Sequence, residues 1–254
     1  MDFFTPERIE KTKALARDGK PFIFDDGDMR TLHFNEQVVQ SAMRLSAPDE
    51  LVIPYTQAMA GFLSLHPLPQ HILMIGLGGG SLAKYCYRYI PSARITVVES
   101  NADVLSMRDQ FMVPPDDARL RVVHADAISC IESLAVGSVD VIMLDGFDAS
   151  GTPPTLRSSD FFMNCKAVLD DRGVLITNMG DQHAHIVGTV TQGQRVFGAF
   201  HHWWFKLAMD NSHIAIAVNA DDDAVSDARL RTAALNIAEQ FSLELVYPKN
   251  LMQE

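Results

Sequence analysis

The stretch His71–Glu99 constrains the fold of this chain more than any other part of it. A short apolar run, Ile72–Ile75, is followed by the glycine-rich segment Gly76–Gly80. Apolar residues then recur at helical spacing, and a β-branched run ends on Glu99. This order predicts a strand, a glycine turn, a helix and a second strand followed by an acid. That is the first half of a nucleotide-binding α/β sheet.

The glycines and the acid have the chemistry of a nucleoside site. Glycine adopts backbone angles closed to other residues and lets a ligand approach the main chain closely. The helix that follows offers free N–H groups in its first turn. Glu99, at the carboxyl end of the second strand, is placed to accept hydrogen bonds from ribose hydroxyls. We therefore predict that Gly76, Gly78, Gly80 and Glu99 bind a nucleoside; a flexible turn and a surface acid are the alternative.

Strands and helices continue to alternate after Glu99. The expected strands cover 119–126, 138–145 and 173–179, and the expected helices 102–111, 127–134, 161–169 and 182–198. Two adjacent strands, 201–209 and 212–219, are joined by Asp210–Ser212 and predict an antiparallel hairpin at the sheet edge. Residues 221–241 predict a last helix, and the segment after it is either a short strand or a loose tail.

The first 47 residues predict a small unit ahead of this sheet. A helix is expected from Thr5 to Asp18. An antiparallel meander of three strands is expected at 21–24, 29–34 and 38–45. A further helix is expected from Pro48 to about Leu65. We therefore expect an N-terminal helix and small β-domain over 1–47 and a nucleoside-binding domain over 48–254.

The closing hairpin and the glycine spacing distinguish between two kinds of α/β sheet. Dehydrogenase sheets are normally parallel throughout, whereas methyltransferase-type sheets end in an antiparallel pair. The glycine fingerprint Gly76-x-Gly78-x-Gly80 is followed by Ser81, where a dinucleotide site usually has Gly or Ala. The expected fold is a class I methyltransferase-like Rossmann sheet, with a parallel core and a C-terminal antiparallel hairpin. S-adenosylmethionine or a relative of it is favoured over NAD.

Acidic residues follow three of the expected strands. In an open parallel sheet, ligands bind outside the carboxyl ends of the strands. After the third strand, Asp126 is expected near the adenine amino group. After the fourth, Asp145 is expected at the reactive end of the cofactor, with Asp148 three residues further on. The alternative for each acid is a cap at the start of the next helix.

Charge and composition narrow the classes of partner. The net charge of −11 disfavours nucleic acid, whose phosphates require clustered Lys and Arg, and is compatible with a cationic substrate. The start of the chain does not resemble a signal peptide, and no apolar run is long enough to cross a membrane. The three cysteines have no metal-ligand spacing, and their odd number fits a reducing compartment. We expect a cytoplasmic protein without a metal.

The motifs between about residues 29 and 180 resemble those of the spermidine synthases, or polyamine aminopropyltransferases. They include VVQS in the meander, PDELVIPYTQAM before the first strand of the main sheet, the glycine turn and the pair Asp145/Asp148. The resemblance implies a small N-terminal β-domain on a methyltransferase-like sheet, and a homodimer. It also implies transfer of an aminopropyl group from decarboxylated S-adenosylmethionine to a small-molecule diamine such as putrescine.

The resemblance also implies roles for individual residues that bind the cofactor. Gln40 corresponds to a residue that contacts the sulfonium end. Glu99 corresponds to the residue that holds the ribose, and Asp126 and Ala127 to those at the adenine.

For the amine, the resemblance implies that Asp145 accepts the proton and that Tyr55 and Asp148 line the pocket. An amine is protonated at neutral pH and cannot attack in that form, so a carboxylate must orient it and take its proton. Asp145 is the predicted catalytic residue.

The chain departs from the family pattern mainly in the amine half of the site. Gly79 stands where the family has the Asp that binds the free amino end of the aminopropyl group, so discrimination against intact S-adenosylmethionine is expected to weaken. Tyr-Gln-Glu is replaced by Tyr55-Thr56-Gln57, and the late Pro-Thr-Tyr-Pro-Ser-Gly stretch has no counterpart. The chain therefore resembles a divergent, synthase-like member of the family. A methyltransferase acting on a small acceptor and a non-catalytic nucleoside-binding homologue stay open as alternatives.

Overall fold

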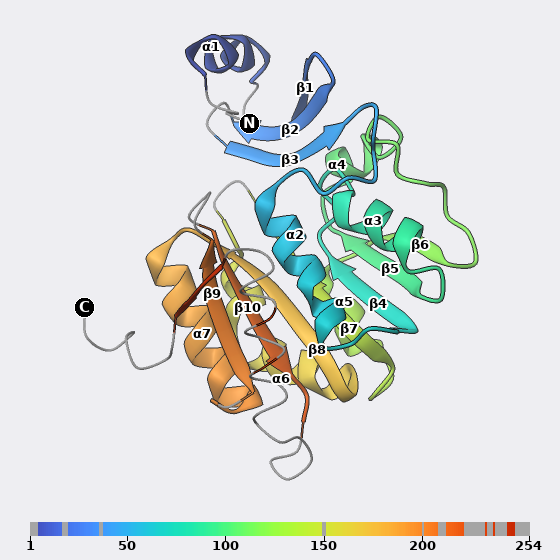
Figure 1. Ribbon diagram of the computed structural model, residues 1–254, viewed down its shortest axis with the longest axis vertical. Helices are drawn as coiled ribbons and strands as arrows, with labels where there is room; N and C mark the ends of the chain where they lie inside the picture. Colours follow the sequence, from blue (N-terminus) through green and yellow to red (C-terminus); the bar gives the residue numbers. More distant parts are fainter. Residues whose placement is uncertain are drawn as a thin grey trace.

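The computed structural model describes residues 5–16, 20–35, 38–148, 151–199, 201–207, 212–220 and 243–246, together with residues 232 and 236. A small sheet at one end of the molecule lies beside a large one (Figure 1). The small sheet is antiparallel, in the order β1-β2-β3, and is preceded by a helix. Its elements are α1 (Pro6–Leu15), β1 (Phe22–Asp26), β2 (Met29–Asn35) and β3 (Val38–Arg44). The predicted meander is present.

The large sheet has eight strands in the order β11-β9-β10-β8-β7-β4-β5-β6. The strands from β6 to β8 are parallel, and β10, β9 and β11 each run antiparallel to the neighbour before them. The strands are β4 (His71–Ile75), β5 (Arg94–Glu99), β6 (Leu120–His124), β7 (Val139–Leu144), β8 (Leu169–Gly180), β9 (His202–Leu207), β10 (His213–Val218) and β11 (Leu243–Val246). The predicted fold class is confirmed.

The hairpin of β9 and β10 does not form the edge of the sheet, as the sequence suggested. β10 lies between β8 and β9, and β11 pairs with the other side of β9. The reason is apolar content: five of the six residues of β10 are buried, which suits a strand covered on both faces. Of the two alternatives for the segment after residue 241, the short strand is confirmed as β11. Asp210, Asn211 and nearly all of the helix expected at 221–241 lie outside the described residues.

Helices cover both faces of the large sheet. Alternate residues of β4 point to opposite sides: Ile72 and Met74 join one apolar core, and Leu73 and Ile75 join the other. The first face carries α2 (Pro54–Ala60), α3 (Ser81–Tyr89) and α4 (Ala102–Ser106), with the small sheet packed beside them. The second face carries α5 (Ala127–Glu132), α6 (Ser159–Val168) and α7 (His183–Phe197).

Three expected element boundaries differ from the structure by four residues or more. The helix expected from Pro48 begins at Pro54, because residues 44–50 form turns and the residue before a proline is extended. It continues as a short 3₁₀ helix, η1 (Gly61–Ser64). The helix expected at 102–111 ends at Ser106. The fifth strand of the chain's parallel series begins at Leu169 rather than Gly173. A second 3₁₀ helix, η2 (Pro154–Arg157), follows the loop after β7.

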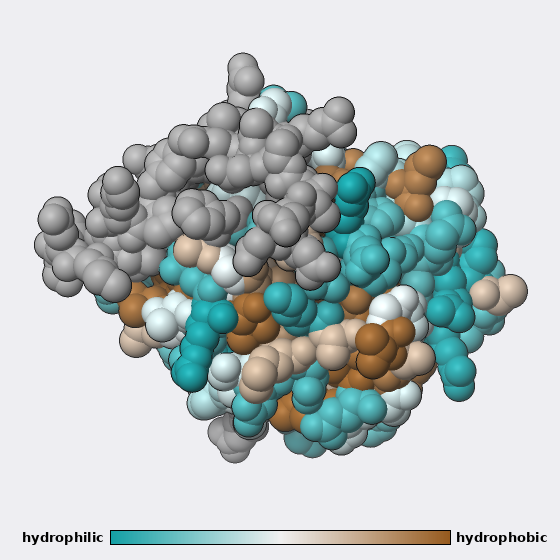
Figure 2. Space-filling view, turned by 90° about the horizontal axis from the view of Figure 1, so that it is seen from below, coloured by the Kyte–Doolittle hydropathy of each residue, from teal (hydrophilic) through white to brown (hydrophobic). Residues whose placement is uncertain are grey.

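Seen from below, the face outside the grey atoms is a mixture of hydrophilic residues and separate apolar groups (Figure 2). None of the helices in the described part of the chain has the length and apolar character needed to cross a bilayer.

Candidate active site

A cleft of about 1100 Å³ opens above the carboxyl ends of the parallel strands. Residues from β4, β5 and β8 and from the loop after β7 form its floor, and residues from β2, β3 and α2 form a wall. The described residues that line it include five carboxylates and neither Lys nor Arg. The carboxylates are Glu99, Asp126, Asp145, Asp148 and Asp181. Such a cleft favours a ligand that carries positive charge.

The glycine turn connects β4 to α3 at one end of this cleft. Gly76 has φ +97°, and a Cβ atom on it would lie 2.2 Å from the main-chain oxygen of Asp145. Gly76 and Gly78 line the cleft. Gly80 has φ +67° and stands at the N-cap of α3, but it is not among the lining residues. Gly80 therefore shapes the turn and does not line the cleft.

Glu99 is buried at the end of β5 and lines the cleft. Its Oε2 accepts a hydrogen bond from the Leu77 N–H (2.9 Å), and its Oε1 accepts one from the Asn101 N–H (2.8 Å). Each carboxylate oxygen can accept a second hydrogen bond, so the two anchored oxygens keep acceptor capacity for hydroxyl groups. The side chain is thus rigidly oriented beside the glycine turn.

Asp126 acts as a helix cap and also lines the cleft. Its Oδ1 accepts hydrogen bonds from the N–H (3.0 Å) and the hydroxyl (3.3 Å) of Ser129 in α5. Ala127, the first residue of α5, lines the cleft beside it. The capping alternative is therefore confirmed, and it places the carboxylate at the rim of the cleft.

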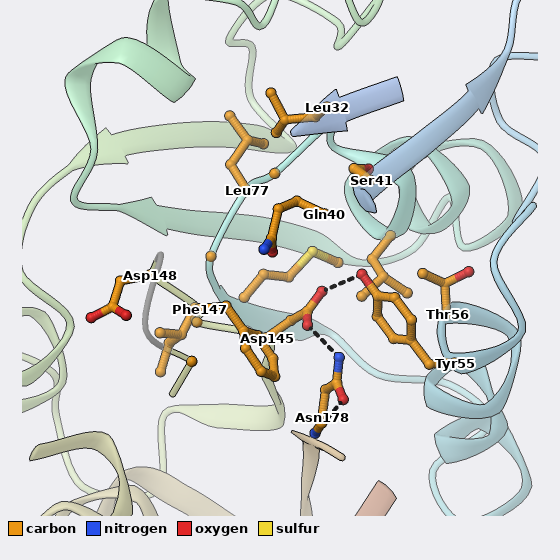
Figure 3. A pocket seen from close by; sticks show the side chains of 18 of the residues that line it. Leu32, Gln40, Ser41, Tyr55, Thr56, Leu77, Asp145, Phe147, Asp148 and Asn178 are labelled. Atoms are coloured by element: carbon orange, nitrogen blue, oxygen red, sulfur yellow. Dashed lines mark hydrogen bonds between the residues drawn. The ribbon is translucent and has the colours of Figure 1, made fainter. Parts of the chain in front are cut away.

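Asp145 follows β7 at the floor of the cleft and is held by two donors (Figure 3). The Tyr55 hydroxyl donates to Oδ2 (3.1 Å), and the Asn178 amide donates to Oδ1 (2.9 Å). The Asn178 amide oxygen in turn accepts the Gly180 N–H (3.0 Å), which orients its NH₂ group toward Asp145. The carboxylate is fixed in one orientation.

The environment of Asp145 suits a group that exchanges protons near neutral pH. Burial raises the pKa of Asp145 to about 6, while the hydrogen bonds from Asn178 and Tyr55 act in the opposite direction, and the nearby charge of Glu99 raises it further. The carboxyl group is therefore mostly ionised at pH 7 and still readily protonated. Those are the properties of a general base.

The remaining predicted residues surround this group. Gln40 extends from β3 into the cleft (Figure 3). Tyr55 lines the cleft and contacts Asp145 directly. Asp148 is exposed at the rim, where its main chain exchanges hydrogen bonds with Gly151 (3.0 and 3.2 Å). Its carboxylate is directed away from that of Asp145 (Figure 3).

Asn178 was missed by the sequence reasoning. It lies near the carboxyl end of the apolar strand β8, and a polar side chain at that place is the one signal that could have found it. Asp145 has the corresponding place directly after β7.

Gly79 leaves no room for a side chain in the turn. A Cβ atom on it would lie 2.6 Å from the Ser41 hydroxyl and 2.8 Å from Cδ1 of Phe111. Contacts this close do not occur without movement of the neighbours, so the aspartate that the resemblance implies at this position would not fit the present packing.

One group of possible metal ligands occurs in the described part of the chain, outside the cleft. Ligand atoms of His66, Asp140 and Asp170 lie within 4.8 Å of one another, near the amino end of β7. Asp140 already accepts the N–H groups of Gln70 and His71 with one oxygen. The absence of a metal stays a prediction.

Solved structures share the fold. A probable spermidine synthase from Corynebacterium glutamicum superposes with a TM-score of 0.69 at 20% identity, covering 89% of this chain and 92% of that one. A spermidine synthase in complex with the transition-state analogue AdoDATO has a TM-score of 0.65 at 15% identity, covering 90% and 81%. Human methyltransferase-like protein 13, solved with SAH, has a TM-score of 0.60 at 22% identity, covering 79% and 98%.

Sequence comparison identifies the family. A polyamine aminopropyltransferase from Chromobacterium violaceum is 39% identical over 157 residues, and one from Neisseria meningitidis is 38% identical over 158. Each match covers 61% of this chain and 60% of the relative, so the chain spans less than two thirds of the length of these curated relatives. Residues 53–202 match the family model described as the spermine/spermidine synthase domain. The chain therefore belongs to the spermine/spermidine synthase family.

Proposed function

We propose that this protein transfers an aminopropyl group from decarboxylated S-adenosylmethionine to a small amine, a diamine such as putrescine. The observation that carries the proposal is Asp145, a carboxylate held by Tyr55 and Asn178 at the floor of a cleft without Lys or Arg among its described lining residues. A cationic donor and a cationic acceptor are both attracted to such a site.

Asp145 acts as the general base in the proposed reaction. It accepts a proton from the ammonium group of the acceptor, whose nitrogen lone pair then attacks the methylene carbon bonded to the sulfonium. The new C–N bond forms as the C–S bond breaks, and the electron pair of that bond stays on sulfur as methylthioadenosine leaves. The positive charge on sulfur disappears, so a cleft that aligns the partners and excludes water speeds the step.

The nucleoside half of the cleft supports the same proposal. Glu99, anchored by two N–H groups, is proposed to bind the ribose hydroxyls. Asp126 and Ala127 at the start of α5 are proposed to bind the adenine, and Gln40 the sulfonium end. Gly76 and Gly78 allow the nucleoside to approach the main chain.

A methyltransferase that uses intact S-adenosylmethionine is the second candidate, and Gly79 favours it. Gly79 supplies no acid that would repel the carboxylate of the intact cofactor, and Ser41 and Phe111 pack so closely around it that no side chain fits there. A relative from Xenopus laevis named eEF1A lysine and N-terminal methyltransferase is 33% identical over 145 residues, which cover 51% of this chain and 21% of that protein.

Product analysis tests the proposal. The protein is incubated with either cofactor and a panel of diamines, and the products are identified by mass spectrometry. We expect aminopropylated amine and methylthioadenosine from the decarboxylated cofactor. Methylated amine from the intact cofactor would replace the proposal with the second candidate. Tight methylthioadenosine binding with no product from any amine would indicate a non-catalytic homologue.

An Asp145→Asn variant tests the base. We expect kcat to fall by about 10²-fold or more, the typical size of a general-base contribution, with the affinity for methylthioadenosine nearly unchanged. Asp103→Asn, an exposed acid in α4, is the matched control and should behave as the wild type. Equal loss of turnover and nucleoside affinity in Asp145→Asn would contradict the assignment.

We further propose a homodimer, because the family resemblance implies one, and a cytoplasmic location, because the three cysteines fit a reducing compartment. Light scattering coupled to gel filtration measures the assembly, and a monomer at micromolar concentration would contradict it.

A further inference from the structure

Lys84 is a buried cation behind the glycine turn that the proposed chemistry does not use. It lies in the first turns of α3, is 2% exposed and is absent from the lining of the cleft. Its Nζ donates to the main-chain oxygen of Phe111 (2.7 Å) and to Sδ of Met43 (2.9 Å). Both partners come from segments outside α3: Met43 from β3, and Phe111 from the loop after α4.

These two partners belong to the walls that enclose the glycine turn. The ring of Phe111 packs against Gly79, where an added Cβ atom would lie 2.8 Å from Cδ1 of the ring. Met43 follows Ser41 on β3, and the Ser41 hydroxyl lies at the same glycine, 2.6 Å from the position of that added Cβ. Ser81 at the start of α3 donates to the main-chain oxygen of Ala42 (3.3 Å).

We infer that Lys84 is a positioning residue for nucleoside binding, which rests on the proposed function. Its hydrogen bonds to the Phe111 carbonyl and to Met43 hold the loop after α4 and strand β3 against α3. They thereby keep both segments at the spacing that the turn Gly76–Gly80 requires to accept a nucleoside. Because it touches neither the cleft nor the reacting atoms, its effect falls on cofactor affinity rather than on the chemical step.

Because Lys84 is buried, a positioning role and a purely structural role predict different effects of its substitution on stability and on nucleoside affinity. Removing an amine from water disfavours folding, and burial lowers the pKa of Lys84 to about 7, with a smaller opposing effect from the charge of Asp49. Methionine has a similar length and no such desolvation cost, but it leaves the buried Phe111 carbonyl without the Lys84 donor, so the two effects on stability oppose each other. A positioning role therefore predicts that Lys84→Met changes stability little while it loses nucleoside affinity.

The experiment compares Lys84→Met and Lys84→Arg with the wild type. Calorimetry measures the binding of methylthioadenosine and of both forms of S-adenosylmethionine, and steady-state kinetics give kcat and KM. Lys166→Met is the matched control, because Lys166 in α6 likewise donates to a main-chain oxygen, that of Val196 (3.1 Å), away from the cleft. We expect Lys84→Met to raise Kd and the cofactor KM about tenfold, as for one lost hydrogen bond to a charged group, with kcat within about twofold. Lys84→Arg, which keeps a donor, should bind more tightly than Lys84→Met, and Lys166→Met should match the wild type.

Phe111→Leu provides a second variant that keeps the carbonyl bonded by Lys84 and removes the ring against Gly79. It should weaken nucleoside binding in the same direction. Wild-type nucleoside affinity in a folded Lys84→Met or Phe111→Leu protein would overturn the inference. It would also be overturned if Lys84→Met and Lys166→Met lost stability and nucleoside affinity to the same extent. If the wild type binds none of the three nucleosides, the proposed function fails first and the inference falls with it.

Discussion

A single residue, Asp145, shows how the surroundings set the chemistry of a carboxyl group. Burial raises its pKa to about 6, and the donors on Asn178 and Tyr55 keep that pKa from rising further. Each donor stabilises the ionised form, so the loss of either one favours the protonated form. The same two contacts therefore control both the orientation and the ionisation of the proposed base.

The pH dependence of turnover follows from these contacts. Because the proposed mechanism uses the ionised form of Asp145, kcat/KM should fall as the pH drops below about 6. Tyr55→Phe and Asn178→Ala should each shift this acidic limb to higher pH, by about half a unit to one unit. Profiles from pH 5 to 9 with one amine provide the measurement, since the titration of the amine is common to all variants. A shift to lower pH would contradict the roles of both donors.

The stability of the protein should report the same shift with a defined sign. The pKa of Asp145 is higher in the folded state than the usual 3.8, so the folded state binds more protons between about pH 4 and 6. Its contribution is present below pH 4 and is lost as the pH rises through about 6. Asp145→Asn removes this loss, so its Tm relative to the wild type should be higher at pH 7 than at pH 4. Thermal unfolding at both pH values tests this, with Asp103→Asn as the control.

At the scale of an element, the β4–α3 turn depends on close backbone approach. Gly76 lies where β4 meets the end of β7, its φ of +97° is unfavourable for any other residue, and its missing side chain makes room for the Asp145 carbonyl. The turn is thus in direct contact with the main chain of the proposed base, although Gly76 and Asp145 follow different strands, β4 and β7.

Gly76→Ala should therefore destabilise the protein strongly. The methyl group would lie 2.2 Å from a main-chain oxygen, and strain and displacement together should cost about 3 kcal/mol or more. Gly137→Ala is the matched control: Gly137 has φ +65° and nothing within 4 Å of an added Cβ, so it should cost only about 1 kcal/mol. Urea unfolding gives both values. Equal costs would show that the approach of the Asp145 carbonyl does not matter.

At the scale of the whole molecule, charge favours a cationic ligand. The net charge is −11, and the described lining of the cleft has five carboxylates without Lys or Arg. Low-dielectric walls concentrate the field of such charges within a cleft, and salt screens it.

Salt should consequently weaken amine binding more than nucleoside binding. Between about 50 mM and 500 mM NaCl, where the screening length falls by more than half, the KM for a diamine should rise several-fold. Methylthioadenosine carries no net charge, so its Kd, measured by calorimetry over the same range, is the control and should change little. An unchanged amine KM would contradict electrostatic attraction of the acceptor.

The sequence by itself determined the local order of elements and the class of fold. Apolar periodicity, the glycines and the acids after the strands are local signals, and parallel strands necessarily bring their carboxyl ends to one edge. For that reason Glu99, Asp126 and Asp145 were correctly expected at one cleft. Turns were harder to predict. Pro48, Asp49 and Glu50 resemble the start of a helix, but the chain forms turns there, in which the Ala47 N–H donates to the Arg44 oxygen and the Glu50 N–H to the Ala47 oxygen.

Tertiary structure alone decided the contacts between segments far apart in the chain. The insertion of β10 between β8 and β9, the meeting of Tyr55 and Asn178 at Asp145, and the burial of Lys84 all depend on which surfaces pack together. Local sequence patterns do not specify such partners. Tyr55 and Asp145 are 90 residues apart in the sequence, and their hydrogen bond depends on how α2 packs against the large sheet rather than on the residues next to either one. The amino acids that perform the proposed chemistry were visible in the sequence; the environment that tunes them was not.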